Sequence, residues 1–230
     1  MITIQYLEPG QHIAGITPSQ ARLKLRAAIK HLPIDCLLMG WDVPYKIHEV
    51  CQNETNQSNI KLYRWQPLLT GDGTIYPKIK WRTRNVNMVP VNGYLGLAEF
   101  TFMCPNNPEV RTAILTHVAD LAHSGIYDGI FLDRMRYPSP AADPVNSLTC
   151  FCEHCHTAAH EYGLDLENIR HSLVDAKEKH LLRVLSGDKI QPLSDFFDFR
   201  QHTITQFISA TVDAISFADL EIGQIGRAHV

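Results

Sequence analysis

A carboxylate ends an apolar run near the middle of this 230-residue sequence. Gly129 to Leu132 has the length and composition of a buried strand, and Asp133 follows it directly. A carboxylate in that position can serve as a general acid, a general base or a substrate ligand. Alternatively, Asp133 forms salt bridges that order Arg134 and Arg136. Consecutive strand residues point to opposite faces, so Asp133 and Arg134 are not expected to share one role.

Aromatic and polar side chains also end the other strands that the sequence predicts. A sugar ring offers an apolar face and hydroxyl edges, and an aromatic ring beside a polar group can contact both. Each tryptophan alone is more often an ordinary packing residue. Together, the strand ends favour a carbohydrate site with Asp133 as the catalytic residue. The expected substrate contacts are Trp41, Asp42, Trp65, Arg136 and Tyr137.

Four of the six cysteines are spaced as metal ligands. The motif CFCEHC places Cys150, Cys152 and Cys155 in one tight loop, and Cys104 precedes the helix that leads into the Asp133 strand. The start of that helix and the end of the strand lie at the same end of the unit, so the four thiols can meet. Four thiolates suit a closed, structural Zn²⁺ site without catalysis. Disulfides and free thiols remain alternatives, and the histidines between the cysteines can substitute as ligands: His154, His156 and His160.

Segments of alternating strand and helix character position these residues. The order of strand, helix, strand, helix, strand, long loop, helix, strand and helices is typical of a parallel α/β sheet. The expected strands are 2–7, 34–43, 60–69, 129–133 and 220–223. The expected helices are 17–32, 45–52, 107–124, 158–163, 166–185 and 194–215. We expect a polar loop at 53–59 and a long irregular segment at 71–96.

This order favours a (β/α)₈ TIM barrel. The glycine-rich G-x-G-x-x-G loop of dinucleotide-binding sheets follows none of the strands. A whole barrel needs eight strands and typically about 250 residues. The sequence supplies four strands and the start of a fifth, so we expect residues 1–224 to form the N-terminal portion of a barrel, about four to five βα units. The last residues, 225–230, read IGRAHV, which resembles a translated sequencing adapter. We expect a non-native tail there; the alternative is a native frayed end.

Composition narrows the class of protein further. Hydrophobic residues make up 45% and charged residues 20%, as in ordinary globular proteins. The formal charge is −3 and the pI about 6.4, which does not favour a nucleic-acid partner. Apolar runs have strand length, so no membrane helix is expected. The start lacks a basic region and a long apolar region, so we expect a cytoplasmic protein.

Two motifs resemble known families. The stretch DGIFLDRMRYP, 128–138, is similar to the strand-four signature of glycoside-hydrolase-like TIM barrels. The segments CPNNPEVR and CFCEHC resemble the cysteine-zinc elements of glycoside hydrolase family 42 β-galactosidases. That resemblance implies that Cys104, Cys150, Cys152 and Cys155 hold structural zinc. Family 42 enzymes end strand four in Asn-Glu, whereas this chain has Leu132 and Asp133, so β-galactosidase specificity does not carry over.

The first functional hypothesis is therefore a glycoside hydrolase, incomplete and inactive as given, that acts on a carbohydrate. Such enzymes need two carboxylates, and the resemblance implies a nucleophile on a later strand. Asp42 and Glu99 are weaker candidates within this chain. The second hypothesis is a non-catalytic carbohydrate-binding or scaffold barrel. The third, a metal-dependent deacetylase or amidohydrolase, needs His and Asp ligands at the strand ends. The oligomeric state does not follow from the sequence.

Overall fold

The fold is a parallel sheet whose strands follow the order of the sequence. A computed structural model describes residues 2–6, 15–139, 148–175 and 193–224. The strands are β1 (Thr3–Tyr6), β2 (Cys36–Met39), β3 (Lys61–Pro67), β4 (Gly129–Asp133) and β5 (Glu221–Gln224), and each pairs in parallel with the next. The α/β prediction is confirmed. The expected tail at 225–230 lies outside the described residues.

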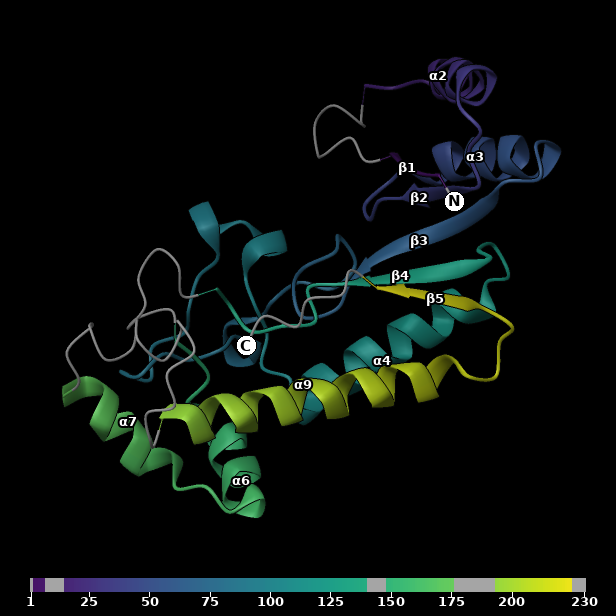
Figure 1. The fold of residues 1–230 in the computed structure, drawn as a ribbon. Helices are drawn as coiled ribbons and strands as arrows, with labels where there is room; N and C mark the ends of the chain where they lie inside the picture. Colours follow the sequence, from purple (N-terminus) through teal and green to yellow (C-terminus); the bar gives the residue numbers. More distant parts are fainter. Residues whose placement is uncertain (1, 7–14, 140–147, 176–192, 225–230) are drawn as a thin grey trace.

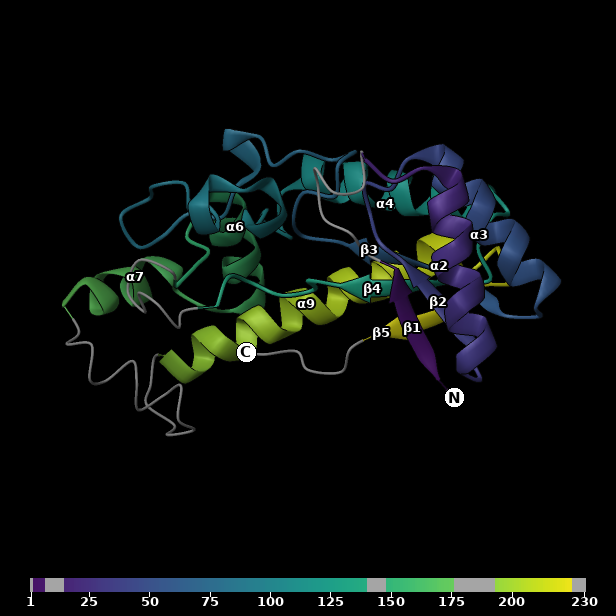
Figure 2. The same ribbon diagram turned by 90° about the horizontal axis from the view of Figure 1, so that it is seen from above.

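Helices connect the strands in the expected alternation (Figure 1). The helices are α2 (Pro18–His31), α3 (Tyr45–Gln57), α4 (Pro108–His123), α6 (Glu153–Tyr162), α7 (Leu166–Asp175) and α9 (Leu193–Ile215). Short 3₁₀ helices η1 (Ile79–Trp81), η2 (Tyr94–Gly96) and η3 (Ala98–Phe100) interrupt the long segment between β3 and α4. Seen from above, α6 and α7 lie at one end of the molecule and α2 and α3 at the other (Figure 2). No helix in the described ranges is long and apolar enough to span a membrane.

The register gives the sheet two different faces. Leu37, Leu62 and Ile130 are at most 1% exposed and lie on the face against which the helices pack. On the opposite face, Trp65 pairs with Phe131 and Pro67 with Asp133, so these side chains share one side. Trp65, Phe131 and Asp133 stay partly exposed there. We call this second side the open face, and it corresponds to the interior of a barrel.

Two hydrophobic clusters stabilise the helix-covered face. The first joins β2 and β3 to α2 and α3 through residues such as Leu25, Met39 and Val50. The second joins β4 to α4 and α9 and continues into the cysteine-rich segment, with Ile130, Phe151 and Phe207 among its members. Burying each such side chain contributes about 1.5–3 kcal/mol. The second cluster therefore ties the candidate metal ligands to the sheet.

Helix boundaries follow the capping signals in the sequence. The Asn107 side chain accepts hydrogen bonds from the amides of Glu109 (2.9 Å) and Val110 (3.4 Å), with Pro108 at the first turn of α4. Gly163 ends α6 with φ 89°, a conformation that glycine adopts without a Cβ clash. These caps fix where each helix begins or ends relative to the strands.

The expected polar loop at 53–59 is wrong for most of its length, because α3 continues to Gln57. Glu54 is only 4% exposed and accepts hydrogen bonds from Arg26 Nε (2.7 Å) and Nη2 (3.0 Å) in α2. Thr55 is fully buried, and its hydroxyl donates to the Cys51 carbonyl (2.9 Å). Tertiary contacts with α2 therefore extend a helix whose residues alone favour a loop.

Candidate active site and metal centre

Asp133 ends β4 on the open face, where its carboxylate is held by two donors. The Trp65 indole Nε1 donates to Oδ2 (2.9 Å), and the Arg134 amide donates to Oδ1 (2.6 Å). The side chain keeps 25% of its surface exposed. A carboxylate that accepts one hydrogen bond at each oxygen retains lone pairs for a substrate hydroxyl. Asp133 is thus oriented and accessible at the carboxyl end of a parallel strand, where ligand sites of barrels lie.

Arg134 turns the chain away from the sheet and joins three segments. Its φ is 54°, in the left-handed region. Its guanidinium lies 4.9 Å from the ring centroids of both Trp41 and Phe100. Nη1 donates to Thr70 Oγ1 (3.3 Å) and to the Glu99 carbonyl. Burial lowers the pKa of Arg134, whereas Asp133 and Glu99 act in the opposite direction. Arg134 Nε also lies 3.8 Å from Asp133 Oδ2. Arg134 therefore lies beside the Asp133 carboxylate and contacts the aromatic side chains around it, although sequence parity predicted separate roles for the two residues.

Aromatic rings form a series that leads from the strand ends outward. Trp41 and Trp65 meet edge to face with centroids 5.5 Å apart, and Trp65 meets Phe131 at 6.0 Å. Farther out, Phe100 and the 72% exposed Tyr94 have centroids 6.3 Å apart. Arg134 links the two groups by its contacts with Trp41 and Phe100. The structure thus brings the predicted Trp41 and Trp65 together beside Asp133.

The other predicted substrate contacts are spread around the site. Asp42 is exposed in the turn after β2, with φ 59°. The Arg136 guanidinium lies 4.8 Å from the Phe102 centroid and donates to the Tyr137 carbonyl (3.1 Å). Tyr137 is only 5% exposed and packs against Arg200 of α9. Its ring belongs to the core near the cysteines rather than to the open face. The expected contact between Tyr137 and a sugar does not fit this burial.

A buried polar network lies on the helix-covered face of β3. Arg64 Nη1 donates to the Gly40 carbonyl (3.2 Å), and Gln66 Nε2 donates to Asp72 Oδ2 (2.6 Å). His117 Nε2 of α4 lies 2.9 Å from the same Asp72 oxygen. Burial alone would raise the pKa of Asp72, but bonds from His117, Ile75 and Gln66 outweigh it and lower that pKa. Gln66 therefore anchors the loop after β3, and Arg64 anchors the turn after β2. Leu62, Arg64 and Gln66 are alternate residues of β3, so the period-two pattern of a strand places all three on one face.

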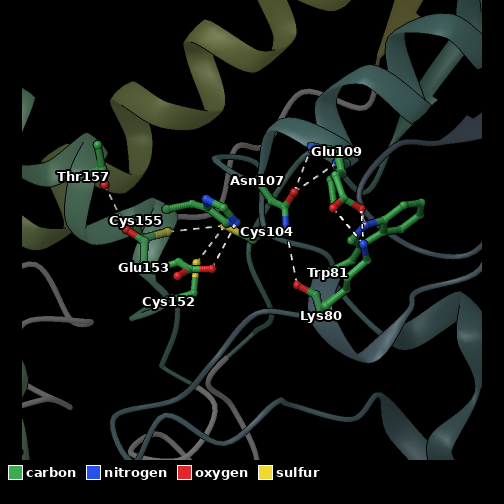
Figure 3. Close-up of polar contacts among 11 residues, drawn as sticks. Lys80, Trp81, Cys104, Asn107, Glu109, Cys152, Glu153, Cys155 and Thr157 are labelled. Atoms are coloured by element: carbon green, nitrogen blue, oxygen red, sulfur yellow. Dashed lines mark hydrogen bonds and ion pairs between the residues drawn. The ribbon is translucent and has the colours of Figure 1, made fainter.

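The four predicted metal ligands are brought together, and all of them are buried. Figure 3 shows three of them, Cys104, Cys152 and Cys155. The sulphur atoms of Cys104, Cys150, Cys152 and Cys155 all lie within 4.8 Å of one another. The distances from Cys104 Sγ to Cys152 Sγ and to Cys155 Sγ are both 3.4 Å. Cys104 comes from the segment before α4, Cys150 and Cys152 come directly before α6, and Cys155 lies in the first turn of α6. The metal-site geometry thus joins the chain on both sides of β4.

The cluster passes a geometric test for a tetrahedral metal. Sulphur ligands about 2.3 Å from zinc stand roughly 3.8 Å apart, which falls within the observed spread. The Arg84 amide donates to Cys150 Sγ (3.3 Å), and Asn106 Nδ2 donates to Cys155 Sγ (3.4 Å). Donors of this kind stabilise thiolates that ligate a metal. Without a metal, burial raises the pKa of Cys104, so the same pocket would disfavour an unligated thiolate there.

No protein-family model and no curated protein matches the sequence. Solved structures do resemble the fold. A hypothetical protein from Ruminiclostridium thermocellum has a TM-score of 0.54 at 10% identity, with 98% of this chain and 97% of that chain covered. A β-galactosidase from Rahnella sp. R3 has a TM-score of 0.56 at 13% identity, covering 90% of this chain and 33% of that one. The catalytic domain of a β-amylase from Paenibacillus polymyxa has a TM-score of 0.55 at 13% identity, with 96% of this chain and 65% of that chain covered.

At these identities the comparisons establish the fold alone. The chain spans about a third of the β-galactosidase and about two thirds of the β-amylase domain. Five parallel strands alternating with helices thus match portions of the TIM-barrel domains of glycosidases.

Proposed function

We propose that this chain carries part of the active site of a glycoside hydrolase, with Asp133 as its acid/base. The observation that carries this proposal is the position of the Asp133 carboxylate on the open face at the end of β4, one-quarter exposed and oriented by Trp65. The aromatic series beside it suits the apolar faces of sugar rings. The fold resemblance to glycosidases supports the same reading without fixing the sugar.

In this proposal Asp133 exchanges a proton with the glycosidic oxygen as the sugar passes through an oxocarbenium-like state. A second carboxylate is required, about 5–5.5 Å away for retention of configuration or about 6.5–9.5 Å for inversion. Asp42 is exposed and Glu99 is partly buried, and both lie on segments at the carboxyl ends of the strands. A later strand of a longer protein is the other source.

We further propose that the four-cysteine cluster holds structural zinc. Cys104, Cys150, Cys152 and Cys155 would be the ligands, and their full thiolate set leaves no position for a reactive water. When bound, the ion supplies a cross-link between the segments before α4 and before α6. Its contribution to the site is indirect, because it would connect the chain on the two sides of β4, the strand that ends in Asp133.

Hydrolysis of a panel of aryl glycosides by the protein encoded at the natural locus tests the first proposal. Asp133→Asn should lower kcat/KM by about 100-fold or more on the best substrate, the usual size of an acid/base contribution. Asp213→Asn makes the same chemical change at an exposed position of α9 and should leave the rate unchanged. Equal rates for wild type and Asp133→Asn would rule out this role for Asp133.

A non-catalytic carbohydrate-binding barrel is the second candidate. It is favoured by the fact that both Asp133 oxygens accept hydrogen bonds, which suits a fixed acceptor for a sugar hydroxyl. In that case no aryl glycoside is cleaved, yet oligosaccharides quench the fluorescence of Trp41 and Trp65. Trp41→Leu would then weaken oligosaccharide binding, whereas Asp213→Asn would not.

A further inference from the structure

A buried guanidinium lies in the core beside the four-cysteine cluster. Arg200 of α9 is 4% exposed, and among the described residues its Nε and Nη1 make no hydrogen bond. Its Cζ lies 4.5 Å from the ring centroid of Tyr137. The ring centroids of Phe196 and Phe197 are 5.6 Å and 5.5 Å away. An arginine with unsatisfied donors in such a core is costly unless a compensating negative charge is nearby.

The neighbours of Arg200 connect it to the thiols. Phe196 stacks on Phe151, with centroids 5.1 Å apart, and Phe151 lies between Cys150 and Cys152 in the sequence. Arg200 covers the ring of Tyr137, whose pKa is raised by burial and further by Cys155, Cys104 and Cys150. Burial lowers the pKa of Arg200 to about 10, while Tyr137, Cys150 and Cys155 act to raise it. Arg200 therefore remains charged at neutral pH.

A metal bound by four thiolates would supply the missing negative charge. A divalent ion with four thiolate ligands carries two net negative charges, which a buried site must offset. The hydrogen bonds from Arg84 and Asn106 reach only Cys150 and Cys155. The other buried arginine of the described ranges, Arg64 of β3, donates to the carbonyl of Gly40 after β2 and belongs to a different network.

We infer that Arg200 is the charge-compensating residue of the metal centre, acting through Tyr137 and the surrounding aromatic rings rather than as a ligand. This role is separate from the proposed glycosidase chemistry and rests on metal binding by the four cysteines. It explains why a cation with unpaired donors is retained in an apolar core. The bare alternative is that Arg200 only stacks on its three aromatic neighbours.

Zinc competition against a chromophoric chelator tests the inference on the whole chain. Arg200→Met should weaken zinc binding by about 10- to 100-fold, as loss of an outer partner of a metal site does. Arg200→Lys keeps the charge and should stay within about threefold of wild type, less than 1 kcal/mol of binding free energy. Arg64→Met removes an equally buried guanidinium elsewhere and should leave zinc affinity unchanged.

Two further measurements separate a lost charge from a damaged fold. Visible spectra of the Co²⁺-loaded variants report whether the tetrahedral thiolate site still forms. Unfolding with and without metal should show that Arg200→Met destabilises the metal-loaded protein more than the metal-free protein. Equal destabilisation of both forms, with zinc affinity within about threefold of wild type, would overturn the inference. Failure of wild-type protein to bind zinc would overturn it as well.

Discussion

At the scale of single residues, polar and aromatic side chains near the end of one strand divide between its two faces and have different surroundings. Trp65 and Asp133 share the open face and form a hydrogen bond across β3 and β4. Arg64 and Gln66, one residue away on either side of Trp65, are buried on the helix-covered face. Polar character at a strand end therefore identifies the region of a site, whereas strand parity decides which side chains reach it.

His48 should make the protein sensitive to mild acid. Its ring is 9% exposed, and Tyr127 Oη lies 3.1 Å from Nδ1. Burial, reinforced by Arg64, lowers the pKa of His48 from 6.5 to about 4. The unfolded chain then binds a proton that the folded chain does not, so stability is complete above about pH 6.5 and falls as the pH drops toward about 4.

The expected loss over that window is on the order of 3 kcal/mol of unfolding free energy. Urea unfolding at a series of pH values measures it. His48→Gln, which can still accept a bond from Tyr127, should remove this part of the pH dependence. His31→Gln changes an exposed histidine and serves as the control. A variant whose pH profile parallels that of wild type would contradict the prediction.

At the scale of elements, α4 and its cap connect the sheet with the cysteine cluster. Asn107 follows Cys104 closely, and its amide also donates to the Lys80 carbonyl (3.3 Å) of η1 (Figure 3). Trp81 Nε1 donates to Glu109 Oε2 (2.8 Å) in the first turn of α4. The long segment between β3 and α4 is thereby fixed to the helix whose start carries the first cysteine.

Asn107→Ala should lower the free energy of unfolding by about 1 kcal/mol, within the usual range of about 0.5–2 for a lost N-cap. The amides of Glu109 and Val110 lose their acceptor in this variant. Asn107→Asp keeps the cap oxygen and loses only the bond to Lys80, so it should cost less. Denaturant unfolding of the three proteins decides the order, and equal stability for Ala and Asp would count against the capping role.

Metal removal should loosen one part of the molecule and spare another. If zinc joins Cys104 to the segment before α6, chelation should increase hydrogen exchange in α6 and at the start of α4. The cluster of α2 and α3 with β2 and β3 contains none of these ligands and should exchange as before. Mass spectrometry of protein with and without chelator tests this, and uniform deprotection throughout would argue against a local cross-link.

The sequence predicts these elements better than it predicts the site. Strand β4 and helix α4 are found as expected, because an apolar run and an Asn-Pro cap act locally. The end of α3 is missed because Glu54 is paired with arginines of another helix. The placement of Tyr137 is missed because burial under Arg200 depends on α9, far along the chain. Local signals give elements, whereas the surroundings of a side chain require packing between distant segments.

At the scale of the whole molecule, the described sheet has β1 and β5 as its outer strands. Outer strands present unpaired backbone groups that can pair with another chain. Ile222 in β5 is 41% exposed. Within β5, the one charged residue is Glu221. This chain therefore carries an edge that favours association.

The 230-residue chain should self-associate at micromolar concentration, and Ile222→Lys should reduce this association. Lysine on an outer strand opposes edge-to-edge pairing by charge and solvation. Val174→Lys makes the same kind of change at a 52% exposed position on α7 and should have no effect. Sedimentation velocity measures the association of the three proteins. A wild-type protein that stays monomeric at all concentrations would show that the outer strand does not drive association.

The position of the cysteines has a consequence for biosynthesis. Cys104 is synthesised before β4, and the remaining thiols are synthesised only after β4. A nascent chain that ends at Asp133 therefore has one of the four thiols, whereas one that continues past Gly163 has all four. If the cluster holds zinc, binding by all four thiolates becomes possible only after the first four strands have been synthesised, so metal binding would be a late step in the folding of the nascent chain.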